Sequence, residues 1–512
     1  MMGKKELAPK LLYSVTIEDL VPGDNFYRRL SEFLDLIFAY QECKSIYGKT
    51  GNPSIDPVVF FELVLFGYFE NIISDRELIR RASDSLGVRL YLGYDLDEEL
   101  PCHSTISRTR VKIPEEVFEK LFDKILQMCV ENGLVGGEKQ SIDSTLVKAN
   151  ASLESLEKKR PQLELNQYIE ATRKENPIEE IKNAASAIED KKQSGEQADM
   201  ELVTIPETKC KKEERKSCSN EEYRSKTDPD SRIARKPGKL TNLYYMTHYS
   251  VDSKAKIITD VLSTHADQSD SDALLEIVKR TEERLNKNGL KIKSVAADKN
   301  YCSGKNLREL EEKGIEPFIP TQKHPNTTGG IDKNNFDYDG QRDEYICPAG
   351  NILKYCYTTK REAKVYAVKE KECLGCPMRD KCTSGKKIRR VQHSIYKAEY
   401  DRLFARIRSY SGKKMRRIRQ ITTEPLFAEA KENHGLSKFM TRGIEKAKKN
   451  SILIASIQNL KRLMTFCKRK LPNEMVKEKI TVLKNSCVSF FAGADYGIAI
   501  SEGTTMSHYV IV

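Results

Sequence analysis

Long hydrophobic runs are what the sequence most plainly lacks. No stretch reaches the roughly 18 consecutive apolar residues that a membrane-spanning helix needs. Residues 1–6 carry charges but have no apolar segment behind them, which a secretory signal would require. We therefore expect a soluble, cytoplasmic protein that has no membrane partner.

A disulfide framework is also missing, although cysteine itself is not. The 13 cysteines are an odd number in a chain of 512 residues, whereas disulfide frameworks occur mainly in small secreted proteins. Metal ligation and ordinary burial are the uses that we expect. A nucleotide-binding loop is absent too, because Cys43 stands where the first glycine of a loop ending at Gly48-Lys49-Thr50 would have to be. No nucleotide cofactor is predicted.

Acidic residues are fewer than basic ones. The 75 Asp and Glu against 87 Lys and Arg leave a net charge of +12, which favours an anionic partner, either nucleic acid or an acidic membrane. A basic run between residues 406 and 419 contains no acid. Such a run is usually a solvated face, unless it flanks a site that acts on phosphates. Its members are Arg406, Arg408, Lys413, Lys414, Arg416, Arg417 and Arg419.

Apolar periodicity predicts an all-helical region over residues 1–135. Apolar side chains recur at helical spacing from Asp56 to Ile73 and again from Val117 to Val130. Between these stretches, Ser74 with Glu77 three residues later has the pattern of a capping box at the start of a helix. The region is typical of a compact helical domain.

Two interpretations of this helical region stay open. Arg108 and Arg110 follow the hydroxyl-rich stretch 101–107 and would suit a direct contact with DNA. Short helices joined by turns are equally typical of packing or dimerisation domains. The sequence does not decide between the two.

Strand-like and helical stretches alternate beyond the helical region. Starting with the run 141–147, the order is three strands, a helix, a strand, a helix and a strand, which is typical of a mixed α/β sheet. A hairpin-length connection at 252–256 joins the second strand to the third. The later strands are predicted at 243–251, 257–263, 292–297 and 316–320, and the helices at 271–286 and after Ser303.

These patterns divide the chain into seven segments. Charged and amide residues dominate the third segment and predict an exposed helical excursion or a partly disordered linker. The segments are 1–135, a helical N-terminal DNA-binding or dimerisation domain; 136–151, the first core strand; 152–238, the charged excursion; 239–335, the continued core; 336–392, a cysteine-rich insertion; 393–465, the C-terminal part of the core with the catalytic helix; and 466–512, a tail without an assignable pattern.

Three acidic residues lie within or beside stretches that are predicted to form the core, where a buried carboxylate needs a positively charged partner. Asp143 lies inside the strand-forming run 141–147, Asp298 closes the apolar run 295–298, and Glu424 opens a helical segment. Mg²⁺ prefers one or two carboxylates together with waters and phosphate oxygens. Two such ions promote in-line displacement at phosphorus. We predict that Asp143 bridges two Mg²⁺ or Mn²⁺ ions and that Asp298 and Glu424 each hold one.

The sequences around these acids resemble the three signatures of DDE transposases of bacterial insertion sequences. The matching stretches are 141–145 (SIDST), 296–301 (AADKNY) and 424–431 (EPLFAEAK). Further stretches resemble the N-terminal domain and the C-terminal end of the same enzymes, and they are 53–57, 74–78 and 101–107 for the former and 437–443 and 459–463 for the latter. The resemblance covers most of residues 45–465 apart from the charged excursion.

The resemblance implies an RNase H-like catalytic core, Mg²⁺-dependent cleavage at transposon ends and joining of the freed 3′-hydroxyls to target DNA. The implied partners are double-stranded DNA and, for the pairing of two ends, a second copy of the chain. Two alternatives stay open, a catalytically inactive DNA-binding relative and an RNase H-like nuclease without strand transfer.

The helix that carries Glu424 offers further site residues. Lys431 stands seven residues later and therefore on the same helical face, where it can meet a phosphate near the metal. In related transposases an arginine precedes the glutamate at a fixed offset. Gln420 occupies that offset here, so that Arg419 or Arg416 would substitute.

Basic residues on both sides of the three acids are predicted to neutralise backbone phosphates. Such contacts make DNA binding strongly dependent on salt. The predicted DNA contacts are Arg416, Arg417, Arg419, Lys438, Arg442, Lys446, Arg108 and Arg110.

Cysteines gather in the insertion. Cys373 and Cys376 form a closely spaced pair, Cys382 follows them, and Cys347 precedes them in a turn-forming Cys-Pro-Ala-Gly sequence. Four thiolates with this spacing favour a tetrahedral zinc site. Cys356 can replace one ligand, and the alternative is a small β insertion with reduced thiols.

Overall fold

The computed structural model describes residues 15–48, 54–159, 219–235, 240–322, 331–383 and 388–470. The chain divides into two compact units, 1–117 with 459–512 and 118–458. Most of the charged excursion and nearly all of the tail lie outside the described residues. Among the described helices, none combines the length and the apolar character that crossing a bilayer would take.

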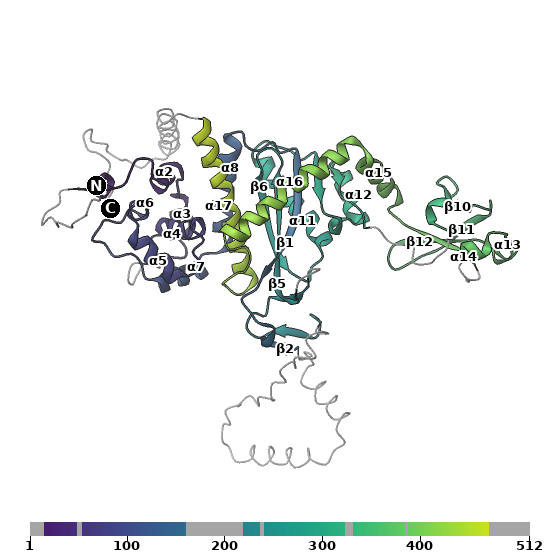
Figure 1. Ribbon diagram of the computed structural model, residues 1–512, viewed down its shortest axis with the longest axis horizontal. Coiled ribbons are helices and arrows are strands. Elements are labelled where there is room, and N and C mark those ends of the chain that lie inside the picture. Colours follow the sequence, from purple (N-terminus) through teal and green to yellow (C-terminus); the bar gives the residue numbers. More distant parts are fainter. Residues whose placement is uncertain are drawn as a thin grey trace, which may run out of the picture. The chain divides into compact units, whose positions relative to one another are not determined.

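The first unit is helical, as the sequence predicts (Figure 1). Its apolar helix α4 starts where Asp56 accepts a hydrogen bond of 2.7 Å from the backbone N–H of Val58. The helix ends at Phe69 rather than Ile73, because Asn71 adopts a φ of 54° that no helix can continue through. The helices are α1 (Ile17–Leu20), α2 (Phe26–Phe33), α3 (Phe38–Cys43), α4 (Pro57–Phe69), α5 (Asp75–Asp84), α6 (Leu86–Leu92) and α7 (His103–Lys112).

The predicted capping box at the start of α5 does not form. Ser74 is the N-cap residue, but its side chain accepts no capping hydrogen bond. Glu77 instead pairs with Arg80 at 2.6 Å and with Arg81 at 2.7 Å. Two guanidinium groups on the same helical turn compete successfully with one backbone N–H for this carboxylate.

The second unit contains a six-stranded mixed sheet, which confirms the predicted α/β class (Figure 1). β5 is antiparallel to β1, β4 and β6, whereas β7 is parallel to β1 and β8 is parallel to β7. The strand that carries Asp143 is therefore central. The strands are β1 (Lys139–Lys148), β4 (Arg232–Ala234), β5 (Asn242–Asp252), β6 (Ile257–His265), β7 (Ser294–Ala297) and β8 (Glu316–Phe318).

Helices pack against this sheet. Arg284 on α11 pairs with Glu119 and Asp123 on α8 and with the buried Asp260 on β6, so that an ion-pair network holds these elements together. α16 packs against β1, β5, β7 and β8. The helical elements are α8 (Glu115–Glu131), α11 (Asp270–Lys287), η3 (Lys299–Tyr301), α12 (Gly304–Glu312), α15 (Lys397–Arg408), α16 (Tyr410–Asn433) and α17 (Ile444–Lys470), of which α17 continues past 458 into the first unit.

The prediction that Glu424 opens a helix was wrong. α16 begins much earlier, where Ser409 accepts a hydrogen bond of 3.1 Å from the backbone N–H of Gly412. Proline is favoured at the first helical position, which Pro425 would occupy if Glu424 preceded the helix. Here it lies inside α16, where it cannot donate to the carbonyl of Ile421 and locally weakens the helix beside Glu424.

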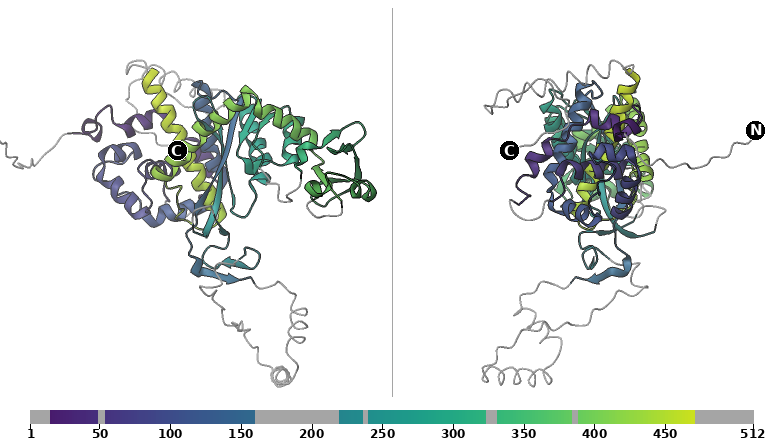
Figure 2. Two further views of the ribbon diagram at one scale, coloured as in Figure 1. Left: turned by 45° about the vertical axis from the view of Figure 1, so that its right-hand side comes forward. Right: turned by 90° about the vertical axis from the view of Figure 1, so that its left-hand side faces the viewer.

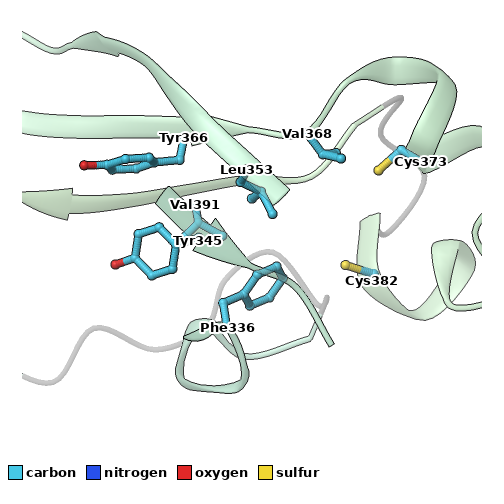
Figure 3. Close-up of a cluster of buried hydrophobic side chains, with 8 residues drawn as sticks. All are labelled: Phe336, Tyr345, Leu353, Tyr366, Val368, Cys373, Cys382 and Val391. Carbon is cyan, nitrogen blue, oxygen red and sulfur yellow. The ribbon is translucent and has the colours of Figure 1, made fainter. Parts of the chain in front are cut away.

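The insertion between β8 and α15 forms a separate five-stranded antiparallel sheet. Its core contains the buried Tyr345, Leu353 and Tyr366 together with Cys373 and Cys382 (Figure 3). The elements are η4 (Lys333–Asn335), β9 (Asp337–Asp339), β10 (Glu344–Ile346), β11 (Ile352–Thr358), β12 (Ala363–Ala367), α13 (Glu370–Leu374), α14 (Arg379–Thr383) and β13 (Arg390–Ser394).

The two described ends of the charged excursion form a small sheet. β2 (Leu156–Lys158), which follows the short η1 (Leu153–Ser155), pairs antiparallel with β3 (Tyr223–Ser225), beyond the ends of β1 and β5 (Figures 1 and 2). The hydroxyls of Ser155 and Ser225 are 2.6 Å apart. The sequence analysis did not predict these strands, and residues 160–218 of the predicted excursion lie outside the described part of the chain.

Candidate active site

Strand register brings two of the three predicted acids together. β1 and β7 are parallel, and Ile142 is the partner of Ala297. Asp143 directly follows Ile142, and Asp298 directly follows Ala297. The backbones of the two acids therefore lie side by side at about the 4.8 Å spacing of neighbouring strands. Two like charges at this spacing repel each other unless a cation lies between them.

The side chain of Asp143 faces α16. Tyr249, its antiparallel partner on β5, stacks on Phe427 of α16 with ring centroids 4.6 Å apart, so this face of the sheet is the one that α16 covers. The Oδ2 atom of Asp143 accepts hydrogen bonds from Arg419 Nη1 at 2.7 Å and from Thr423 Oγ1 at 3.1 Å. Two residues one turn apart on α16 therefore hold this carboxylate.

Opposing effects act on the pKa of Asp143. Burial raises the pKa of Asp143, and the charge of Asp298 raises it further, whereas the guanidinium of Arg419 lowers it. The side chain of Asp143 is 19% exposed and that of Arg419 is 14% exposed. A desolvated carboxylate beside a second one is a site that gains from a divalent cation.

A polar network on the opposite face was missed by sequence reasoning. The Oγ of Ser144 donates a 2.8 Å hydrogen bond to Oδ1 of Asp270, the first residue of α11. His248, the strand partner of Ser144, lies 3.7 Å from Asp270 and places its Nδ1 2.7 Å from the hydroxyl of Tyr301. This network anchors the loop that carries Asp298, because Tyr301 is only three residues further on.

The same network has shifted proton affinities. Burial lowers the pKa of His248 to about 3, so the imidazole is neutral, and burial also raises the pKa of Asp270. The negative charge of Asp298 contributes to the raised pKa of Asp270, so these two carboxylates interact. Only its position before a predicted helix distinguished Asp270 in the sequence.

Glu424 and Lys431 lie on α16, on the C-terminal side of the two residues that contact Asp143. Glu424 is exposed and directly follows Thr423, which contacts Asp143. Lys431 is seven residues further along the same helix and hence on the same face as Glu424. Within the described ranges, no three His, Cys, Asp or Glu side chains stand close enough together to hold a metal ion.

The residues present nevertheless fit a divalent cation. Mg²⁺ takes most of its ligands from water and substrate phosphate and needs only one or two carboxylates. Asp143 and Asp298 can supply that pair, because they directly follow the strand partners Ile142 and Ala297. Since Asp143 now bonds to Arg419, an incoming cation would compete with a guanidinium for Oδ2.

The other predicted DNA-contact residues differ in the exposure and in the bonding partners of their side chains. Arg416 and Arg417 are exposed on α16. Arg110 makes a two-bond ion pair with Asp75 of the same unit, at 2.8 and 3.0 Å. Arg108 also bonds locally, to Ser104 of its own helix.

The three predicted DNA-contact residues that follow α16 differ in their exposure and in their contacts. Lys438 is exposed, and its backbone forms an isolated bridge with Lys148. Arg442 is exposed and donates to the carbonyl of Asn150 at 3.2 Å. Lys446 on α17 is partly buried.

Comparisons with known proteins yield two family matches. Residues 15–112 match the family described as transposase domain (DUF772), and residues 346–464 match the family described as transposase DDE domain. The second stretch contains Glu424 and Lys431, and neither stretch contains Asp143 or Asp298. A solved structure described as a piggyBac transposase synaptic complex with hairpin DNA is similar, with 10% identity, a TM-score of 0.36, and coverage of 91% of this chain and 81% of that chain. No curated protein matches the chain.

Proposed function

We propose that this chain is a DDE transposase of an insertion sequence that binds the terminal inverted repeats of its element, cleaves the DNA ends and joins their 3′-hydroxyls to target DNA. The two transposase family matches support this proposal. The observation that supports this reaction best is the side-by-side placement of Asp143 and Asp298. The partner is double-stranded DNA, and the pairing of two ends calls for a homodimer. The reaction belongs in the cytoplasm, where bacterial DNA lies.

We assign the metal-binding role to Asp143, Asp298 and Glu424. Two Mg²⁺ or Mn²⁺ ions bound there would activate the attacking oxygen and stabilise the leaving one. Arg419 and Thr423 fix the Asp143 carboxylate against α16 before DNA arrives, so that less ordering is left to the reaction itself.

The remaining residues position DNA. Lys431 shares a face of α16 with Glu424 and would place its ammonium group on a phosphate beside the metal site. Arg416 and Arg417 are exposed on the same helix and would neutralise the flanking backbone. The DNA contact of Arg110 stays a prediction, and its guanidinium is paired with Asp75 in this structure.

A pre-cut DNA end tests this proposal. The inverted repeats that flank the gene are synthesised as a duplex with a free 3′-hydroxyl and incubated with the full chain, Mg²⁺ and a plasmid. Covalent joining of the duplex to the plasmid is the expected result. Hydrolysis without joining would instead identify a nuclease, and binding without either reaction would identify an inactive relative.

Removing two exposed arginines should weaken DNA binding and its dependence on salt. We expect Arg416→Ala combined with Arg417→Ala to reduce the slope of log K against log[salt] by roughly 2, because each phosphate contact contributes about 0.9. Affinity at low salt should fall at least about tenfold. Fluorescence anisotropy with a labelled duplex at several salt concentrations measures both quantities.

A charge-matched pair on other helices serves as the control. Lys279 and Lys305 have side chains that are each 70% exposed, and each pairs with a glutamate one turn further along its own helix. Lys279→Ala combined with Lys305→Ala removes the same charge and should leave the slope unchanged. Equal effects of the two double variants would mean that net charge alone, and not the surface of α16, governs binding.

A further inference from the structure

Four cysteines from separate parts of the insertion face one small cavity. Cys347, Cys373, Cys376 and Cys382 all line it, and its volume is about 20 Å³, the space that one small ion or one water requires. Cys373 on α13 and Cys382 on α14 lie at the same end of the buried core, one above the other (Figure 3). Apolar side chains make up most of the remaining wall, so the thiols are its dominant chemistry.

The backbone from Cys347 to Gly350 forms a tight turn of the kind that often presents a cysteine to a metal ion. The N–H of Gly350 donates to the carbonyl of Cys347 at 2.8 Å, and Gly350 adopts a φ of 82°, which favours glycine at this position. The N–H of Asn351 donates to Sγ of Cys347 at 3.3 Å. A hydrogen bond of this kind stabilises a sulfur that carries negative charge, as outer partners do at metal sites.

The other three cysteines come from one compact segment. The backbone N–H of Cys376 donates to the carbonyl of Cys373 at 3.3 Å, so the pair sits in a single turn, and α14 then returns Cys382 to the same cavity. All ten cysteines in the described residues are free of disulfides. The thiols are therefore available as thiolate ligands.

An orphaned donor lies at the same cavity. Arg389 lines it, and its Nε is buried without a hydrogen-bond partner among the described residues, although its other nitrogens reach the carbonyls of Cys382 and Ile331. A buried N–H without an acceptor is costly. Cysteine thiolates around a metal would supply the missing acceptor and would place negative charge beside this cation.

We propose that Cys347, Cys373, Cys376 and Cys382 bind one structural Zn²⁺ ion that ties α13 and α14 to the five-stranded sheet. In the described part of the chain, no three His, Cys, Asp or Glu side chains are close enough together to hold a metal ion, so binding requires the four sulfurs to move inward to about 2.3 Å from the zinc. Binding converts four thiols to thiolates and releases their protons to solvent. The proposal does not depend on the DNA chemistry of the carboxylate site.

Cys356 is excluded from the ligand set. It is exposed on β11, its Sγ donates to the carbonyl of Lys354 at 3.5 Å, and it does not line the cavity. It therefore provides a matched control in the same small sheet. A zinc site that uses Cys356 in place of one of the four would contradict this assignment.

Zinc content of the full chain tests the proposal. Protein purified without chelators is expected to carry about one zinc ion per chain by elemental analysis. Cys356→Ser should retain this content, and Asp143→Asn should retain it too, because that variant alters only the carboxylate site. Cys373→Ser combined with Cys376→Ser should lower it at least about tenfold. Absence of zinc from the unaltered chain, or equal loss in Cys356→Ser, would overturn the proposal.

Cobalt substitution covers the case in which the double variant fails to fold. Co²⁺ added to zinc-depleted, unaltered protein should give the sulfur-to-cobalt charge-transfer absorption and the intense visible bands of tetrahedral thiolate coordination. Single Cys347→Ser and Cys382→Ser variants should each weaken the charge-transfer band, because one thiolate is lost. Octahedral, oxygen-type spectra from the unaltered protein would refute a four-cysteine site.

Discussion

Replacement of Asp143 by asparagine is expected to lower the rate of DNA cleavage by roughly three orders of magnitude, or about 4 kcal/mol of transition-state stabilisation. Asparagine keeps the size of the side chain and can still bond to Arg419 and Thr423. It loses the negative charge that a bridging metal ligand requires. Cleavage of an inverted-repeat duplex under single-turnover conditions measures the change.

The fold and the DNA affinity of this variant should be unaltered. Burial raises the pKa of Asp143, so desolvation already disfavours the charged form of this side chain, and we expect the uncharged asparagine to be accommodated. Asp267→Asn is the control, because Asp267 is an aspartate of the same unit whose side chain is 39% exposed and pairs with Arg232. If Asp143→Asn cleaves as fast as Asp267→Asn, the metal-binding role of Asp143 is refuted.

Glu424→Gln should also abolish most cleavage, with a loss of roughly a hundredfold or more and a rise in the Mg²⁺ concentration needed for half-maximal rate. The exposure of Glu424 implies that the substitution leaves α16 folded. Glu424 directly follows Thr423, whose hydroxyl contacts Asp143, and we propose that the Glu424 side chain turns toward the site when metal and DNA bind. A Mg²⁺ titration of the cleavage rate separates loss of metal affinity from loss of the chemical step.

Glu432→Gln on the same helix provides the comparison. Glu432 is also exposed on α16, one residue beyond Lys431. Its variant should keep the Mg²⁺ requirement of the unaltered protein. Should Glu424→Gln behave in the same way, the third ligand must be another carboxylate, and Asp270 is the candidate that lies near Asp298.

The part of the site that rests on local sequence was predictable. Strand-forming residues around Asp143 and before Asp298 identify β1 and β7, and the alternation with α11 and α12 indicates a mixed sheet. Once the two strands are parallel neighbours, register alone places the acids together. No knowledge of side-chain contacts is needed for that step.

The part that rests on distant contacts was not predictable. Asp270 joins Ser144 across 126 residues, and Tyr301 reaches His248 across 53. A hydroxyl and an imidazole on exposed-looking strand positions give no sign that they share one buried network. Only tertiary packing decides which polar side chains meet.

Helix α16 shows how a strong local signal can mislead. Proline at 425 is typical of a helix start, whereas the structure places it in the helix interior. Packing of Met415, Leu426 and Phe427 against the rest of the unit offsets the lost hydrogen bond. Arg419 was predicted as a DNA contact from its charge, yet its partner is Asp143, which is 276 residues earlier in the chain.

Metal-directed cleavage of the polypeptide tests the central claim most directly, because it needs no knowledge of the DNA ends. Fe²⁺ replaces Mg²⁺ in such sites and, with ascorbate and peroxide, generates hydroxyl radicals that cut the nearest backbone. We predict cuts close to Asp143, Asp298 and Glu424, suppressed by excess Mg²⁺ and absent in Asp143→Asn. Cuts confined to other segments, or a pattern unchanged in that variant, would contradict a metal site formed by these carboxylates.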